Sequence, residues 1–215
     1  MTSTFTTPTA AASAFFEALH EGRWADAAGL VDAEAAATLR EQRLALLIAW
    51  VQHRDEIRRA REGGEGGGMF GFSSDGKVDQ GQLAVHGTTL LPVFRGSPTL
   101  AELASMSTAA FVELLLEVSN SESGPGEEGP FERPRRRVLG EVREGESIAH
   151  VLYRQEGAGV RYTNPHHVEV VQLRRTDSAW RVLLGMMQND LAEGGFMLHM
   201  DLLDSGSELG PDRVE

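Results

Sequence analysis

Histidines in the second half of the sequence are the first candidates for chemistry. His150 falls in a stretch of alternating residues, where Ile148, His150 and Leu152 share one face of an expected strand. A histidine in an apolar pocket can act as a base near neutral pH, although a hydrogen-bonded core histidine gives the same pattern. His166 and His167 are adjacent, so a strand would turn them to opposite faces, and we do not expect them to share a metal ion.

Sequence motifs that would identify a particular chemistry are missing. The glycine-rich stretch 63–68 is no phosphate-binding loop, because the later Gly76-Lys77 pair is followed by Val78 rather than by Ser or Thr. The basic stretch 133–137 can receive an anion or an acidic segment, or can be a solvated strand entry balanced by neighbouring glutamates. The sequence contains no serine-centred elbow, no helical pair of zinc ligands and no obvious acid–base pair of carboxylates, so we expect neither a metal site nor a cofactor.

Composition and charge exclude several classes of protein. The 215 residues include 20 Lys and Arg against 32 Asp and Glu, which gives a net charge of −12. Such a charge repels phosphate backbones, so nucleic acid is not an expected partner. The sequence contains no cysteine, which excludes disulfides and thiolate chemistry. It has no apolar run of the roughly 20 residues that span a membrane and no apparent secretion signal, so we expect a cytoplasmic protein without membrane contact.

Helical periodicity dominates the first half of the sequence. Thr7-Pro8 predicts a helix start with a hydroxyl cap, and Gly22 predicts the end of that helix. Asp32 is expected to cap a long helix that ends near residue 62. The remaining expected elements are a short helix at 24–30, a strand at 82–91, and helices that begin at Ser97-Pro98 and near Ser107.

The last third of the sequence changes to the alternation that is typical of strands. Strands are predicted from Val138 to Arg143, from 148 to 155, from 166 to 175 and from 179 to 187. Short turns between successive strands predict antiparallel neighbours. Val168 and Val170 lie on one face of the third strand and Val171 on the other, so both faces of the sheet are expected to be covered, one by helices and one by a second copy of the protein. The predicted fold class is therefore α+β.

Loop composition sets the expected domain limits. We predict a single domain over residues 1–190, with a flexible glycine-rich insertion near 63–76 and a loop near 119–134. Residues 191–215 are expected to form a C-terminal extension with an acidic tail.

Two stretches of the sequence resemble the nuclear transport factor 2-like (SnoaL-like) superfamily. Residues 14–28, with Phe15-Phe16 and Arg23-Trp24, look like the first two helices of that family, and residues 168–184, with the turn at Asp177-Ser178, look like its last hairpin. The resemblance covers roughly residues 8–50 and 97–187. It implies N-terminal helices packed on a curved antiparallel sheet in a cone-shaped, cystatin-like roll, with a pocket and a homodimer formed through the sheet.

The resemblance implies a function without fixing it. Ketosteroid isomerases of this superfamily use a first-helix tyrosine as an oxyanion donor, where this sequence has Phe15, and the region of the family's carboxylate base continues here as a helix. The expected function is therefore binding of a small apolar ligand without catalysis. The alternatives are an enzyme of the same fold (a cyclase, dehydratase or isomerase) and a protein-interaction module that uses residues 52–62 or the acidic tail. The residues expected to line the ligand pocket are Phe16, Trp50, His150, Tyr153 and His167.

Overall fold

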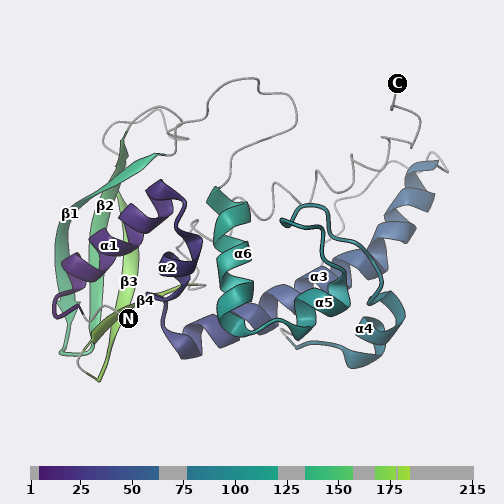
Figure 1. Cartoon of the computed structure of the whole chain (residues 1–215), viewed down its shortest axis with the longest axis horizontal. Helices are drawn as coiled ribbons and strands as arrows, with labels where there is room; N and C mark the ends of the chain where they lie inside the picture. Colours follow the sequence, from purple (N-terminus) through teal and green to yellow (C-terminus); the bar gives the residue numbers. More distant parts are fainter. Residues whose placement is uncertain (1–4, 63–76, 121–133, 157–167, 178, 185–215) are drawn as a thin grey trace. The chain divides into compact units, whose positions relative to one another are not determined.

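The chain folds into two compact units, which are described separately. The computed structural model describes residues 5–62, 77–120, 134–156, 168–177 and 179–184 (Figure 1). The first unit comprises residues 1–36 and 108–196, and the second comprises residues 37–107 and 197–215. The prediction of one domain over residues 1–190 spans parts of both units and stays a prediction.

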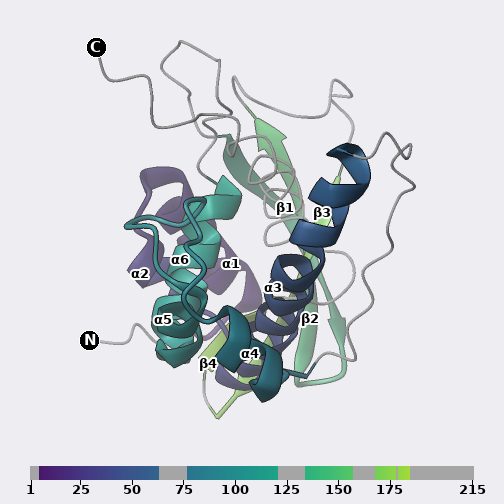
Figure 2. The ribbon, with the colours of Figure 1, turned by 90° about the vertical axis from the view of Figure 1, so that its right-hand side faces the viewer.

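Three helices belong to the first unit: α1 (Pro8–Glu21), α2 (Trp24–Ala28) and α6 (Thr108–Asn120). The Thr7 side chain accepts a hydrogen bond from the backbone N–H of Ala10, and Gly22 ends α1 in the left-handed conformation with φ 71°. Both ends of α1 are confirmed as predicted. Helices α2 and α6 pack side by side (Figure 2).

A four-stranded antiparallel sheet completes the first unit. Its strands are β1 (Arg135–Glu144), β2 (Ile148–Glu156), β3 (Glu169–Thr176) and β4 (Ala179–Leu183), paired in chain order. Helix α1 lies across one face of this sheet and contacts all four strands (Figure 1). The prediction of an α+β fold with an antiparallel meander is confirmed.

Side chains under α1 form the core of the first unit. Residues of β2 alternate between buried and half-buried, because successive side chains of a strand point to opposite faces. We call the face toward α1 the covered face and the opposite one the open face. The fully buried side chains of the unit are mostly aromatic or aliphatic: Phe15, Phe16, Leu19, Phe111, Leu115, Val151, Tyr153, Val171, Leu173, Trp180 and Val182.

A β-bulge in β1 changes which residues meet α1. The register with β2 shifts between Val138 and Gly140, so Leu139 is the extra residue. The sequence prediction of uninterrupted alternation from Val138 to Val142 is therefore wrong, because Val138 lies on the covered face and Val142 on the open face. The bulge brings Glu141 to the covered face, where its carboxylate accepts a hydrogen bond of 3.3 Å from the backbone N–H of Thr9 in the first turn of α1.

The β4 edge of the sheet is closed by the chain itself. Val182 donates its backbone N–H to the carbonyl of Leu30 and accepts from the N–H of Asp32. Asp32 then precedes α3 (Ala33–Glu62), and its side chain accepts a hydrogen bond of 3.0 Å from the N–H of Ala35. The predicted cap at Asp32 and the end of the long helix near residue 62 are both confirmed.

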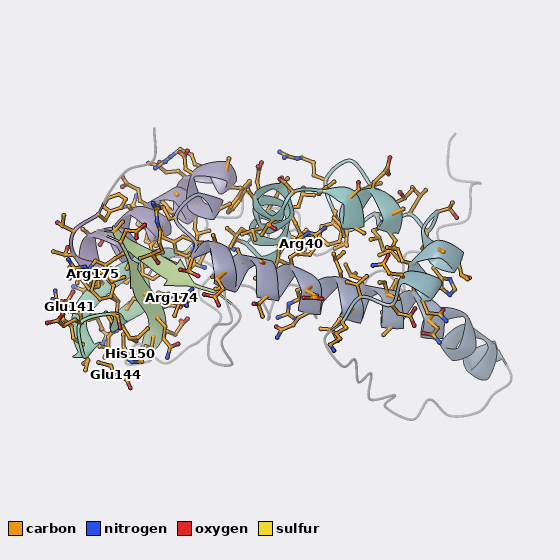
Figure 3. The ribbon with its side chains drawn as sticks, turned by 90° about the horizontal axis from the view of Figure 1, so that it is seen from below. Arg40, Glu141, Glu144, His150, Arg174 and Arg175 are labelled. Carbon is orange, nitrogen blue, oxygen red and sulfur yellow. The ribbon has the colours of Figure 1, made fainter. Side chains whose placement is uncertain are left out.

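The second unit contains the larger part of α3 with α4 (Gln80–His86) and α5 (Leu100–Ser105). The predicted strand at 82–91 is wrong, because its first half, residues 82–86, lies in α4. The Asp79 side chain caps this helix, because it accepts hydrogen bonds from the backbone N–H groups of Gly81 and Gln82 in the first turn. Arg40 of α3 donates to the carbonyl of Ala104 at the end of α5 (Figure 3).

Several predicted segments lie outside the described residues. They are the glycine-rich stretch 63–76, most of the loop near 119–134, and the extension 191–215. Asn120 still belongs to α6, and β1 begins at Arg135. Within the part of the chain that the structure describes, no helix is long and apolar enough to cross a membrane.

Candidate functional site

Tyr153 and Glu169 form a polar pair on the covered face of the sheet. They are direct cross-strand partners on β2 and β3, so the strand register brings their side chains to the same face. The Tyr153 hydroxyl donates a hydrogen bond of 2.6 Å to Oε2 of Glu169. The body of Tyr153 is only 1% exposed, whereas Glu169 is half-buried. A buried hydroxyl and a carboxylate with partial access to solvent therefore lie at one end of the covered face.

Phe16 of α1 forms the apolar neighbour of this pair. Its ring centroid lies 4.5 Å from that of Tyr153 with an interplanar angle of 47°, and Phe15 lies 5.9 Å from Phe16. Phe16 is 2% exposed. The predicted site residues Phe16 and Tyr153 are thus in contact, and we call Phe16, Tyr153 and Glu169 the Tyr153 cluster.

A second polar contact lies at the same end of the covered face. Arg136 is two residues before Val138, the cross-strand partner of Tyr153, and its guanidinium donates 2.9 Å to Oδ1 of Asn120 at the end of α6. Asn120 in turn donates 2.8 Å to the carbonyl of Leu116. By register, Arg136 lies on the covered face two residues along β1 from the strand partner of Tyr153, so a cationic and an amide group lie at the same end of that face as the hydroxyl–carboxylate pair. Such a set can orient a small molecule that carries one or two polar groups on an apolar body.

His150 lies on the open face, opposite to the Tyr153 cluster. The predicted sharing of a face by Ile148, His150 and Leu152 is confirmed, because burial alternates along β2 from Ile148 to Tyr153. Nε2 of His150 lies 3.2 Å from Oε2 of Glu144, and Nδ1 lies 3.4 Å from Nε2 of Gln172 (Figure 3). The sequence-based idea of a base in an apolar pocket is not what the structure shows, because these neighbours are polar and the His150 side chain is 27% exposed. One site on one face of the sheet cannot contain the side chains of both His150 and Tyr153.

The other two predicted pocket residues are not part of the Tyr153 cluster as described. Trp50 is a residue of α3 in the second unit, where it is 6% exposed. His167 lies outside the described residues, as do His166 and His199. Their predicted roles in ligand binding stay predictions.

Asp32 is the centre of a charged network at the β4 edge. Arg174 of β3 donates to both carboxylate oxygens of Asp32 and also donates 2.8 Å to Glu34, while the Thr176 hydroxyl donates 3.1 Å to Asp32. Burial raises the pKa of the Asp32 carboxyl, but hydrogen bonds from Arg174, the Ala35 N–H and Thr176 outweigh it, so its pKa lies below the ordinary value. These contacts attach the first turn of α3 to the sheet, which is a structural role.

The described residues offer no evident metal site. Within the described ranges, no group of three or more His, Asp or Glu side chains is placed to hold a metal ion. The expectation of no metal and no cofactor stays a prediction for the chain as a whole.

Sequence reasoning missed Glu169, Glu144 and Gln172. Glu169 contacts Tyr153, and Glu144 and Gln172 contact His150. Only the pairing of the strands brings these residues together. A signal was present for Glu169, since it is the one acidic residue in a β3 stretch otherwise rich in valine. A carboxylate at the start of a strand with two apolar faces suggests a buried polar partner.

Comparisons with known proteins give no family assignment. No family model matches the chain, and neither a curated protein nor a solved structure matches it.

Proposed function

We propose that the chain is a non-catalytic nuclear transport factor 2-like protein that binds a small apolar ligand as a cytoplasmic homodimer. In this proposal the sheet curves around the helices as a cone-shaped, cystatin-like roll. The observation that carries the proposal is the contrast between the two faces of one sheet. Among the described residues, the covered face has buried aromatic side chains beside the Tyr153–Glu169 hydroxyl–carboxylate pair, and the open face exposes aliphatic side chains.

The Tyr153 cluster supports the ligand-binding part of the proposal. Phe16 and Tyr153 form a buried aromatic contact, and next to it the Tyr153 hydroxyl donates to the half-buried carboxylate of Glu169 at 2.6 Å. A mostly apolar molecule with one hydroxyl or carbonyl group matches this set, because few polar groups suffice to orient a ligand in an apolar site. Glu169 is the residue most exposed to an incoming polar group, since Tyr153 is buried.

Exposed aliphatic residues of the sheet support the homodimer. Val142 of β1 is 59% exposed, Leu139 of the bulge is 42% exposed and Val168, next to β3, is 38% exposed. An antiparallel sheet in water commonly has one polar face, so a sheet with apolar residues on both faces favours a cover on the second face. The proposal assigns that cover to a second copy of the chain.

The ligand is tested by extracting the purified protein with a denaturing solvent and measuring the masses of released small molecules. Glu169→Gln keeps the shape of the side chain but removes its charge, and we expect it to lower the amount of released ligand at least about tenfold. Glu146→Gln is the matched control, because Glu146 is exposed in the turn after β1. Equal ligand recovery from Glu169→Gln and wild type would contradict the proposed site, and absence of any ligand would favour an interaction module that uses residues 52–62.

An enzyme of the same fold is the second candidate, and the Tyr153–Glu169 hydrogen bond is the observation that favours it. A tyrosine hydroxyl can donate to an oxygen that gains charge, and a neighbouring carboxylate can remove a proton from carbon. Incubation with the recovered ligand in D2O separates the candidates. An isomerase, cyclase or dehydratase would incorporate deuterium at carbon or change the mass of the ligand, and Glu169→Gln would abolish the change. A pure binding protein returns the ligand unaltered.

A further inference from the structure

The open face of the sheet has a basic end where β1 begins and β2 ends. Arg135 and Arg137 project from the open face of β1, and Arg154 is the direct cross-strand partner of Arg137 on β2. Glu156 is the one carboxylate among them, and it pairs with Arg137 at 2.7 Å. Two arginines directly opposite each other on a sheet repel, so this end is suited to receive carboxylates.

The opposite end of the same hairpin is acidic. Glu144 is the last residue of β1, its side chain is 76% exposed, and Glu146 follows it in the exposed turn. Oε2 of Glu144 lies 3.2 Å from Nε2 of His150, but most of the Glu144 side chain is exposed, so its carboxylate remains accessible. Arg174 lies on this side of the open face too, but it is engaged by Asp32 and Glu34 (Figure 3).

An apolar strip separates the two charged ends. Val142 projects from β1 next to Gly140, whose cross-strand partner is Leu152, and Leu152 in turn pairs with Val170. A Cβ atom added at Gly140 would meet nothing within 4 Å, and the backbone there has no positive φ. The centre of the strip is therefore flat and open, which allows a second surface to approach closely.

We propose that the open face packs against the open face of a second copy, about a two-fold axis that lies between the faces and perpendicular to the strands. In this arrangement β1 lies over β1 of the second copy, and the two strands are antiparallel. Glu144 of each protomer then faces Arg135 and Arg137 of its partner, and the apolar strips meet around Gly140. The inference rests on the homodimer of the proposed function and adds its orientation and its contacts.

Charge favours this orientation over the other two-fold arrangement of stacked sheets. An axis parallel to the strands would place the three arginines of one protomer over the same arginines of the other, and like charges across an interface cost affinity. The perpendicular axis makes the surface complementary to itself, as a two-fold interface requires. At about 3.4 Å per residue, the nine steps from Arg135 to Glu144 along β1 extend about 30 Å, so the two residues are far enough apart to form two separate charge contacts.

Charge exchange in the full-length chain tests the orientation. Sedimentation equilibrium gives the dimer dissociation constant for wild type, Glu144→Arg, Arg135→Glu and the double variant. We expect each single variant to raise the dissociation constant roughly tenfold or more, because each change places like charges together twice per dimer. The double variant restores opposite charges and should return to within about threefold of wild type.

A steric variant tests the same face without a change of charge. The Cβ atom of Gly140→Trp meets nothing within 4 Å in the protomer, so the variant should keep the far-UV circular dichroism of the fold, while its indole on the open face prevents close approach of the partner. We expect at least a hundredfold increase in the dissociation constant for Gly140→Trp and little change for the control Gly140→Ala.

The outcomes separate failure of the inference from failure of the proposed function. A wild-type chain that stays monomeric at high concentration removes both the homodimer and its orientation. A wild-type dimer that tolerates Gly140→Trp, or whose double charge variant is no better than the single ones, overturns the orientation alone. Ligand recovery from the Tyr153 cluster is unaffected by either result.

Discussion

Arg174 of β3 donates hydrogen bonds to both carboxylate oxygens of Asp32, the residue that caps α3. Nε of Arg174 lies 3.2 Å from Oδ2 of Asp32, and a second guanidinium nitrogen bonds Oδ1. Asp32 is 3% exposed, and it also accepts from the Ala35 N–H and the Thr176 hydroxyl. One side chain therefore fixes the start of a helix and the edge of a sheet together.

Asp32→Asn is expected to destabilise the first unit by about 2 kcal/mol. Asparagine can still cap α3, so the loss reports the charged hydrogen bonds with Arg174 rather than the cap. Arg174 is one-third exposed and can be solvated in the variant, which limits the cost. The measurement is urea unfolding at pH 7. Asp26→Asn is the control, because its pair with Arg23 is exposed to solvent and should contribute little to stability.

Acid should remove the contribution of Asp32. Its pKa is lower in the folded chain than in the unfolded chain, where it is about 3.9, so the unfolded state binds the proton more readily. The stabilisation is therefore complete above about pH 4 and is lost as the pH falls through the folded pKa. The free energies of unfolding of wild type and Asp32→Asn should differ at pH 7 and converge as the pH falls below the folded pKa of Asp32. A difference that stays constant over this range would show that the lowered pKa of Asp32 is not linked to folding.

Tyr153→Phe should cost about 1–2 kcal/mol of stability and most of the ligand. The substitution removes the hydroxyl that donates to Glu169 but keeps the ring against Phe16. Thermal unfolding measures the first effect, and mass analysis of extracted ligand measures the second. If ligand recovery is unchanged while stability falls, the hydroxyl serves the fold and takes no part in binding.

Phe16→Ala distinguishes a core side chain from a ligand-facing one. Phe16 is 2% exposed and packs on two aromatic rings, so its truncation should destabilise the unit by about 3–5 kcal/mol. Phe16→Leu keeps most of the volume and should cost roughly 1 kcal/mol. Chemical denaturation of both variants provides the comparison. A loss below about 1 kcal/mol in Phe16→Ala would mean that the ring faces space a ligand normally fills.

Local signals in the sequence were sufficient for most of the helices and for the meander. Thr7, Gly22 and Asp32 mark helix ends through their own hydrogen bonds or backbone conformations, so no distant contact was needed to predict them. The four strands follow from alternation and short turns for the same reason. The strand prediction that included residues 82–86 was wrong because the helix there, Gln80–His86, has only seven residues, too few to show a helical period. The cap at Asp79 was the local signal for this helix.

The site depended on distant pairing and was only partly predictable. Leu139 forms a bulge because of the register between β1 and β2. A leucine at that position does not by itself predict a bulge. Alternation placed His150 with Ile148 and Leu152 but did not say which face α1 covers, since β2 has apolar residues on both faces. The contact between Tyr153 and Glu169 likewise exists only because of the pairing of two strands that are separated by the segment 157–167.

Native mass spectrometry of the freshly purified 215-residue chain tests ligand binding and dimer formation together, because one spectrum reports both the number of chains and any bound small molecule. We expect a species of two chains that carries a discrete additional mass, which is released on denaturation. A single chain without additional mass, at concentrations where weak dimers assemble, would contradict it.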